Sequence, residues 1–193
     1  MKVSKAQAQA NRERIIEAAA ELFRERGFDG VGVNELMQAA GLTRGGFYGH
    51  FDSKEDLAAR SSEQALAANA AHWSRVVEKA RDPMAALVSF YLSDRHRDAA
   101  GQGCALAALG PDAMRHGDAL RAVFSTGIER FADIVAAQLP ARESDAGRRR
   151  ERSLAVMATL GGALMLSRVA DSEELSREIR TAAIATILDD GGA

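Results

Sequence analysis

The sequence contains little cysteine, proline or aromatic side chain. Among its 193 residues are one cysteine and three prolines, and phenylalanine, tryptophan and tyrosine together make up 5%. A single cysteine excludes an internal disulfide framework and zinc sites built from several thiolates, and it fits a reducing compartment. The four histidines are scattered, with no two at the spacing of a helical ligand pair. We therefore expect a cytoplasmic protein without a metal or a cofactor.

Long apolar runs are also absent. The longest, Leu154–Leu166, contains Thr159, Gly161 and Gly162 and is too short to span a bilayer. No signal-peptide pattern opens the chain, because its first eleven residues form no apolar segment. The sequence contains no phosphate-binding glycine loop, nucleophile elbow or metalloprotease helix motif. These absences predict a soluble protein that is not an enzyme and has no membrane partner.

Neither sign of charge predominates. Lysine and arginine number 25 against 27 aspartates and glutamates, so the formal net charge is −2. A chain of this balance is not attracted as a whole to a polyanion, so any contact with nucleic acid must come from a local patch. Hydrophobic residues, at 47%, exclude a disordered chain. We interpret the basic run at residues 148–152 as the solvated start of a helix.

Apolar residues recur at helical spacing along almost the whole chain. Ile15, Ala19 and Phe23, for example, form one stripe of a helix. Asn11 is a plausible N-cap for that helix, and Gly27 a plausible left-handed ending. No alternating strand pattern is present. The sequence predicts an all-α protein with about nine helices, near residues 12–26, 33–40, 43–51, 53–80, 83–98, 104–114, 118–139, 148–170 and 172–189, and with a loop at 141–147.

The aromatic residues divide the chain into two units. Five of the ten lie within the first 51 residues, and the remainder of the chain is rich in alanine. A unit of some fifty residues needs large side chains to build a core, whereas alanine-rich helices pack closely without them. We expect a three-helix head at residues 1–52 and a larger helical domain at residues 53–193.

Residues 33–48 are typical of a helix-turn-helix. A short helix is followed by Gly41 and then by a second short helix with an apolar inner face. In such motifs the N-terminal residues of the second helix read base edges in the major groove. Arg44 is suited to guanine O6 and N7. The two glycines that follow allow the backbone to approach DNA closely, or they serve tight packing between helices. The predicted groove residues are Thr43, Arg44, Gly45 and Gly46.

Lys54 stands at the start of the next helix, where the helix dipole favours anions over cations. Free backbone N–H groups and a lysine at one helix start form an anion site, which a DNA phosphate would fill. Tyr48 and His50 add further candidate phosphate contacts. Taken alone, Lys54 is equally compatible with a solvated surface position. Together with Arg44 and Tyr48 it favours DNA binding.

The N-terminal part of the chain resembles the DNA-binding domain of TetR-family transcriptional repressors. The resemblance covers about 43 positions and rests on Ala19-x-x-Leu22-Phe23, Gly27-Phe28, Leu36-x-x-Ala39-x-Gly41, Phe47-Tyr48-x-His50-Phe51 and Ser53-Lys54-x-x-Leu57. Relatives often place serine or threonine at the cap where this chain has Gly32, so a phosphate contact there would come from the backbone. The resemblance adds Gly32, Val33 and Asn34 to the expected DNA contacts.

The resemblance implies a homodimer on a palindromic double-stranded operator, with half-sites roughly 34–36 Å apart. It also implies a small hydrophobic effector that binds the C-terminal helices and changes the spacing of the two heads. The last two helices are the family's usual dimer surface, although burial within one subunit would explain the same pattern. The expected interface residues are Leu154, Met157, Gly161, Leu164, Ile179, Ala183 and Ile187.

Apolar and adaptable side chains in the C-terminal part are candidates for effector contacts, although such residues are more often core. They are Trp73, Phe90, Cys104, Met114, Phe124, Met157 and Met165. Cys104 opens a helix, where a thiolate is favoured, so a thiol-based redox or electrophile sensor is one alternative function. A helical small-molecule binding protein that does not bind DNA is another. The leading prediction is a ligand-responsive regulator, most simply a repressor.

Overall fold

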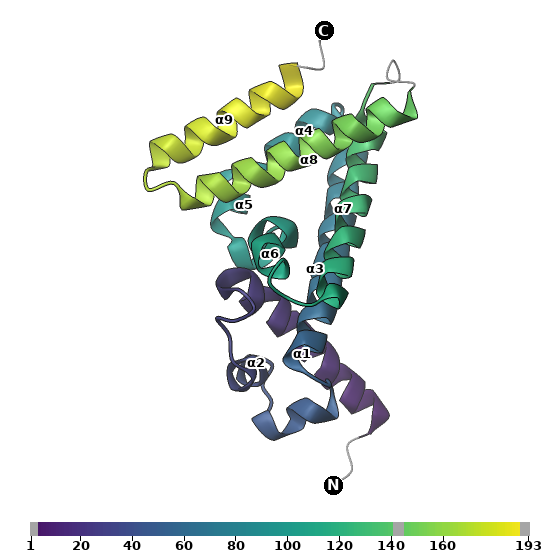
Figure 1. Ribbon diagram of the computed structural model, residues 1–193, viewed down its shortest axis with the longest axis vertical. Helices are drawn as coiled ribbons and strands as arrows, with labels where there is room; N and C mark the ends of the chain where they lie inside the picture. Colours follow the sequence, from purple (N-terminus) through teal and green to yellow (C-terminus); the bar gives the residue numbers. More distant parts are fainter. Residues whose placement is uncertain (1–3, 141–144, 190–193) are drawn as a thin grey trace.

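The computed structural model describes residues 4–140 and 145–189, and over these ranges it contains helices and no strand, as predicted. Its elements are α1 (Lys5–Arg26), α2 (Val33–Ala39), the 3₁₀ helix η1 (Arg44–Gly49), α3 (Lys54–Glu78), α4 (Pro83–Tyr91), α5 (Asp94–Asp98), the 3₁₀ helix η2 (Ala100–Gln102), α6 (Ala105–Ala113), α7 (Asp118–Gln138), α8 (Ala146–Val169) and α9 (Glu173–Asp189) (Figure 1).

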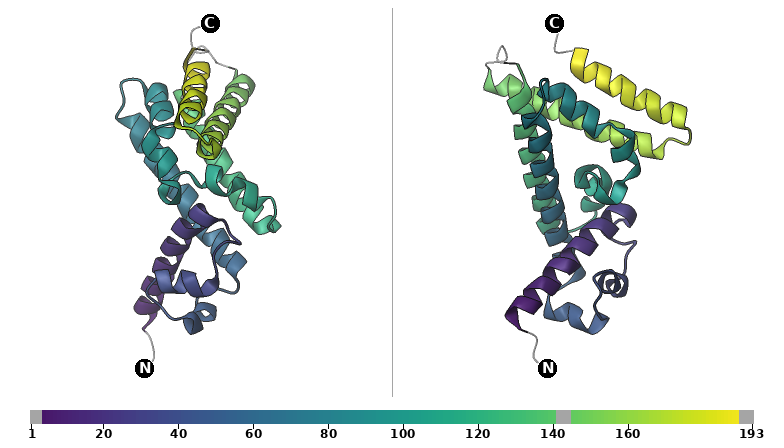
Figure 2. Two further views of the ribbon diagram at one scale, coloured as in Figure 1. Left: turned by 90° about the vertical axis from the view of Figure 1, so that its left-hand side faces the viewer. Right: turned by 180° about the vertical axis from the view of Figure 1, so that it is seen from behind.

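The helices form a small N-terminal head below a larger body (Figure 1). The head contains α1, α2 and η1. The long helices α3 and α7 pack side by side along the body, and α8 and α9 pack together across its far end. Figure 2 shows the same arrangement from two further sides, with α6 between the head and α8. The helix-turn-helix segment therefore lies at one end of the molecule and the last two helices at the other.

Helix α1 ends as predicted but begins earlier. Gly27 has a φ of +74°, and its N–H donates to the Phe23 carbonyl. Phe28 then turns back onto Phe23, with ring centroids 5.2 Å apart. The N-cap is Ser4, whose hydroxyl accepts the N–H of Gln7 at 3.1 Å, and not Asn11. Two good capping residues stand seven positions apart on a polar stretch, and the helix continues to the outer one.

The expected single helix over residues 83–98 is wrong. Asp82 caps α4 and Pro83 occupies its first turn. The helix ends at Tyr91, and Ser93 caps the separate short helix α5 by accepting the His96 N–H at 3.2 Å. A serine inside an apolar pattern competes for backbone donors and so permits this break. The nine α-helices of the described ranges therefore differ from the predicted nine, because η1 replaces one and α4 and α5 divide another.

A basic residue at the start of α8 forms hydrogen bonds with the end of α7, which the sequence alone does not indicate. Residues 141–144 of the predicted loop lie outside the described residues, and Asp145 caps α8 by accepting the Arg148 N–H at 2.9 Å. Arg149 donates to the carbonyls of Ala136, Leu139 and Pro140 at the end of α7. The basic run is thus partly a cap for the neighbouring helix and is not simply solvated.

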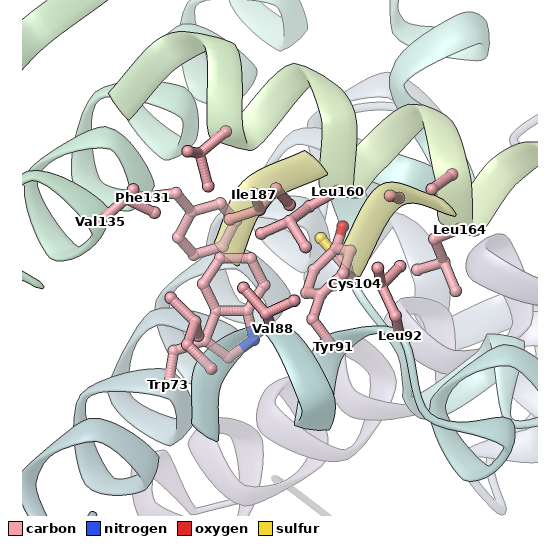
Figure 3. Packing of buried hydrophobic residues seen from close by; sticks show 14 of the residues in the cluster. Trp73, Val88, Tyr91, Leu92, Cys104, Phe131, Val135, Leu160, Leu164 and Ile187 are labelled. Carbon is pink, nitrogen blue, oxygen red and sulfur yellow. The ribbon is translucent and has the colours of Figure 1, made fainter. Parts of the chain in front are cut away.

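Two clusters of buried side chains stabilise the fold. The head cluster contains the predicted aromatic residues Phe23, Phe28, Phe47 and Phe51, and it continues into the body through residues of α3, α6 and α7. The body cluster surrounds Trp73, whose ring stacks on Phe131 with centroids 4.2 Å apart (Figure 3). Side chains of α3, α6 and α7 thus belong to both regions, and the division of the chain after residue 52 stays a prediction.

Candidate nucleic-acid interface

The predicted recognition segment, Arg44–Gly49, packs on buried apolar side chains of the head. Phe47 and Met37 are both completely buried, and the Phe47 ring contacts Phe51, with centroids 5.8 Å apart. The segment is the 3₁₀ helix η1 and not the α-helix expected from residue 43. Three of its six residues are glycines, which favour the α-helix least after proline, and 3₁₀ turns are common in such short pieces. Thr43 is the N-cap residue of η1. Its backbone is extended, and its side chain makes no capping hydrogen bond.

The opposite side of this segment is open to solvent. Thr43, Arg44, Gly45 and Gly46 are all exposed. Arg44 has no ion-pair or hydrogen-bond partner within residues 4–140 and 145–189. A Cβ atom added at Gly45 would meet nothing within 4 Å, and one added at Gly46 would make only an ordinary 3.6 Å contact with Met37. Packing within the head therefore does not require either glycine.

The predicted phosphate-contacting residues follow directly along the chain. Tyr48 is 78% exposed, and its ring is edge-on to Phe47 at 5.2 Å. His50 is partly exposed at the end of η1, and Lys54 is the first residue of α3 and partly exposed. Ser53 caps α3 by accepting the Asp56 N–H at 3.0 Å. An exposed phenol, an imidazole and an ammonium group therefore accompany the guanidinium of Arg44.

The three residues at the start of α2 differ in their surroundings. Gly32 is the exposed N-cap of α2 and provides no side-chain cap, so the first N–H groups of α2 are available to an anion. Asn34 is exposed. Val33 is partly buried against the head cluster, so its side chain contributes packing. The segment is tied to α1 by an ion pair between Arg26 and Glu35.

One cation beside this surface was not expected from the sequence. The Arg12 guanidinium lies over the Phe51 ring, 4.6 Å from its centroid, in a cation–π contact. Arg12 is on α1, in the part of the helix that the sequence predicted correctly. Its contact with Phe51 spans 39 positions, and no local pattern reports such a pairing. It places a third basic group near the loop that joins η1 to α3.

The predicted effector residues do not form one site. Met114, Phe124 and Met157 line an open groove of about 510 Å³ between α6, α7 and α8. Trp73 and Phe90 line a different hollow of about 580 Å³, which also contains Glu17, Glu21 and Arg24 of α1. Met165 is 39% exposed on α8 and lines neither hollow. Only the groove is predominantly apolar, as a site for a hydrophobic effector should be.

Cys104 is buried in the body cluster, beside Tyr91 (Figure 3). Burial raises the pKa of the thiol above its ordinary value, although hydrogen bonds from Tyr91 and from backbone N–H groups act in the opposite direction. Its own N–H donates to His96 Nε2 at 2.9 Å. The expectation that the helix start favours a thiolate here is wrong, because desolvation outweighs the dipole. The geometry gives no support to a thiol sensor.

The expected dimer residues divide into two groups. Leu164, Ala183 and Ile187 are buried within a single chain and belong to the body cluster, so other helices of the same chain already cover their side chains. Helical periodicity identifies an apolar face but not the helix that covers it, and here the cover is within the chain. Four expected residues are partly exposed, and three further apolar residues of α8 and α9 are exposed. These are Leu154, Met157, Gly161 and Ile179, and Leu166, Val169 and Leu175.

A direct contact joins the wall of the groove to the head. Asp112, in the last turn of α6, accepts the backbone N–H of Phe28 at 3.2 Å. His116, just beyond α6, packs edge-on against the Phe28 ring with centroids 5.1 Å apart. Both residues are more than 80 positions from Phe28, so no local sequence pattern indicates the contact. Asp112 and His116 thus connect the end of α6 to the turn between α1 and α2.

Within the described ranges, no group of three or more histidine, cysteine, aspartate or glutamate side chains could hold a metal ion. None of the helices described has the length and apolarity needed to span a bilayer.

Comparison with known proteins places both parts of the chain. Residues 15–60 match the family model of bacterial regulatory proteins of the tetR family, and residues 80–182 match that of the LmrA/YxaF-like transcriptional regulator C-terminal domain. The HTH-type transcriptional regulator AcrR of Shigella flexneri is 41% identical over 28% of this chain and 25% of its own length. The HTH-type transcriptional repressor DhaR of a Mycobacterium strain is 29% identical over 48% of this chain and 47% of its own. The chain thus matches half or less of each of these two relatives.

Longer matches agree with this assignment. An uncharacterized HTH-type transcriptional regulator of Mycobacterium tuberculosis is 26% identical over 83% of this chain and 86% of its own. A TetR-family regulator from Cytophaga hutchinsonii has the same fold, with a TM-score of 0.78, 20% identity and 98% of both chains covered. The second family model alone spans more than half of the sequence. This chain belongs to the tetR family of bacterial regulatory proteins.

Proposed function

We propose that this protein is a ligand-responsive repressor that binds a palindromic operator as a homodimer and is released from it by a small apolar effector. The observation that carries the proposal is Arg44, which is exposed at the start of a short helix packed on buried Phe47 and Met37 and has no partner among the described residues. Direct reading of guanine requires a bidentate donor that is free to bond and that stands on a well-supported segment of backbone.

The residues around Arg44 have separate tasks in this proposal. Gly45 and Gly46 present no side chain, so the backbone comes close to the groove wall. Lys54 and the free N–H groups at the start of α3 bind a phosphate, and Tyr48 and His50 bind others. The phosphate contacts fix the register of the head on the duplex, whereas Arg44 carries the sequence preference.

The homodimer is supported by the outer surface of α8 and α9. Leu166 is 52% exposed, Val169 77% and Leu175 44%. Exposed apolar residues on the last two helices are what a self-complementary interface would cover. Because these helices lie at the end of the body away from η1 (Figure 1), a two-fold axis there would leave both heads free to reach one face of a duplex.

The response to an effector is supported by the groove between α6, α7 and α8. One of its walls is α6, and α6 also holds the head through Asp112 and the Phe28 N–H. An effector that fits the groove better when α6 has moved would favour heads in the moved position. Such a ligand shifts the equilibrium only by its difference in affinity for the two arrangements.

The proposal is tested by measuring DNA affinity with the full chain, on a duplex recovered by selection and on a random duplex of equal length. Arg44→Ala should lose about 1–3 kcal/mol of preference for the selected duplex. Lys54→Ala should weaken binding to both duplexes about equally and reduce the dependence of affinity on salt. Arg130→Ala, which removes an exposed arginine of α7, is the matched control and should change neither.

A result in which Arg44→Ala keeps the full preference would contradict the assignment of base reading to η1. A result in which both Arg44→Ala and Lys54→Ala bind like the unmodified chain would contradict the interface altogether. It would favour the helical binding protein that does not use this surface for DNA.

A further inference from the structure

The groove between α6, α7 and α8 is apolar almost throughout. Its volume of about 510 Å³ is within the range of small-molecule sites. Met114, which lines it, is 79% exposed, and Ile128 is 40% exposed, so apolar side chains of the groove face solvent. Its lining residues are Leu106, Gly110, Ala113, Met114, Arg121, Phe124, Ser125, Ile128, Leu154, Met157 and Ala158.

Only two of these lining residues have polar side chains, and only one of them is charged. The Ser125 hydroxyl donates to the Arg121 carbonyl at 3.0 Å and is therefore already bonded. Among the described residues the Arg121 guanidinium has one partner, Asp118, with Nη1 3.4 Å from Oδ1 and side chains that are 64% and 99% exposed. An exposed pair of this kind contributes little and is readily exchanged for another anion. Arg121 is thus an available cation at the side of an apolar groove.

We propose that the groove binds an apolar molecule with a single carboxylate, which Arg121 holds by its guanidinium. As an account of the effector, this rests on the proposed function. No carboxylate lines the groove to repel the ligand, and guanidinium and carboxylate match in geometry. The lining offers no amide or imidazole side chain, and its one hydroxyl already donates its proton, so it provides few hydrogen-bonding groups for a sugar or a base. The second hollow is more polar, because acidic and basic side chains both line it, among them Glu17, Glu21 and Arg24.

The shape of the apolar part is left adaptable by the lining. Met114 and Met157 come from opposite walls, α6 and α8, and methionine fits ligands of different outline. A flexible alkyl chain therefore suits the groove as well as an aromatic body does. The carboxylate is the fixed requirement, because Arg121 is the only side chain of the lining that can distinguish an anion from a neutral analogue.

The test uses three probes of equal length, namely octanoate, octanamide and octylamine, in calorimetric titrations of the full chain. The unmodified protein should bind octanoate about fivefold more tightly than octanamide, a factor typical of a partly exposed ion pair, and octylamine most weakly. Arg121→Ala should bind octanoate and octanamide with nearly equal affinity, and Arg121→Lys should keep most of the difference. Arg130→Ala, on the same helix but outside the groove, should behave as the unmodified chain.

Three results would overturn the proposal. The first is equal affinity for octanoate and octanamide in the unmodified protein. The second is a preference that Arg121→Ala leaves unchanged. The third is no binding of any probe together with dissociation of the homodimer by Met114→Asp, which would show that a second copy of the chain covers the groove. Release of DNA is measured separately. Octanoate that binds through Arg121 without changing operator affinity would support the groove's ligand class and contradict the effector response.

Discussion

Replacement of Asp112 by alanine tests how firmly α6 holds the head. The carboxylate accepts the Phe28 N–H at 3.2 Å and also pairs with Arg115 at 2.9 Å. Without it the Phe28 N–H loses its acceptor in a partly buried position. A hydrogen bond to an ionised group contributes about 1.5–3 kcal/mol. Because this one is long and the Asp112 side chain is 28% exposed, we expect the lower end, about 1.5 kcal/mol.

Arg115→Ala is the matched control for this change. It removes the ion pair, whose arginine is 70% exposed, and leaves the Phe28 contact intact. Such a pair contributes at most about 0.5 kcal/mol. In a chain of this size about 1 kcal/mol corresponds to roughly 2–4 °C in Tm. Asp112→Ala should therefore lower the Tm by about 3–6 °C and Arg115→Ala by less than about 2 °C.

Thermal unfolding followed by circular dichroism gives both values. The reasoning would be refuted if Asp112→Ala melted within about 1 °C of the unmodified protein, or if Arg115→Ala were as damaging. A functional measurement accompanies the melt. If α6 controls the head through this contact, Asp112→Ala should reduce the change in operator affinity that the effector causes, while effector affinity stays the same.

Three further changes have defined outcomes. Phe47→Ala, at a completely buried position, should lower the free energy of unfolding measured by chemical denaturation by about 3–5 kcal/mol. Tyr48→Ala, at the exposed neighbouring position, should lower it by less than about 0.5 kcal/mol. Burial lowers the pKa of His96 below its ordinary value of 6.5. Its contribution to the free energy of unfolding is therefore complete above that value and is lost as the pH falls through the lowered pKa. Between pH 8 and pH 5 the free energy of unfolding should fall more steeply for the unmodified chain than for His96→Gln. The buried Cys104 thiol should react with an aromatic disulfide far more slowly in the native protein than in denaturant, and rapid native reaction would restore the thiol sensor as a candidate.

Local chemistry accounts for the parts of the fold that the sequence predicted. Gly27 ends α1 because only glycine adopts its positive φ without strain, and Ser53 and Asp82 cap α3 and α4 with their own side chains. The same local sequence patterns led to two wrong predictions, the N-cap of α1 and the single helix over residues 83–98. They cannot decide between Ser4 and Asn11 as caps, and they do not register the break before α5.

Contacts between distant segments account for what the sequence did not reveal. Leu164 and Ile187 have the spacing of an interface, yet neighbouring helices of the same chain bury them. Cys104 has the sequence context of a reactive thiol, but its burial depends on α4. The Asp112 contact with Phe28 likewise exists only in the folded chain. Candidate DNA contacts were easier to infer, because most of them lie within one short stretch around η1.

We propose that two copies of this head bind one palindromic site through Arg44. Selection of bound fragments from a random duplex library, with the purified full-length chain at low ionic strength, tests it most directly. We predict an enriched inverted repeat whose half-site centres are about one helical turn, roughly 34–36 Å, apart, and loss of that enrichment with Arg44→Ala. Recovery of no preferred sequence, or of an asymmetric site that Arg44→Ala enriches equally, would contradict the account.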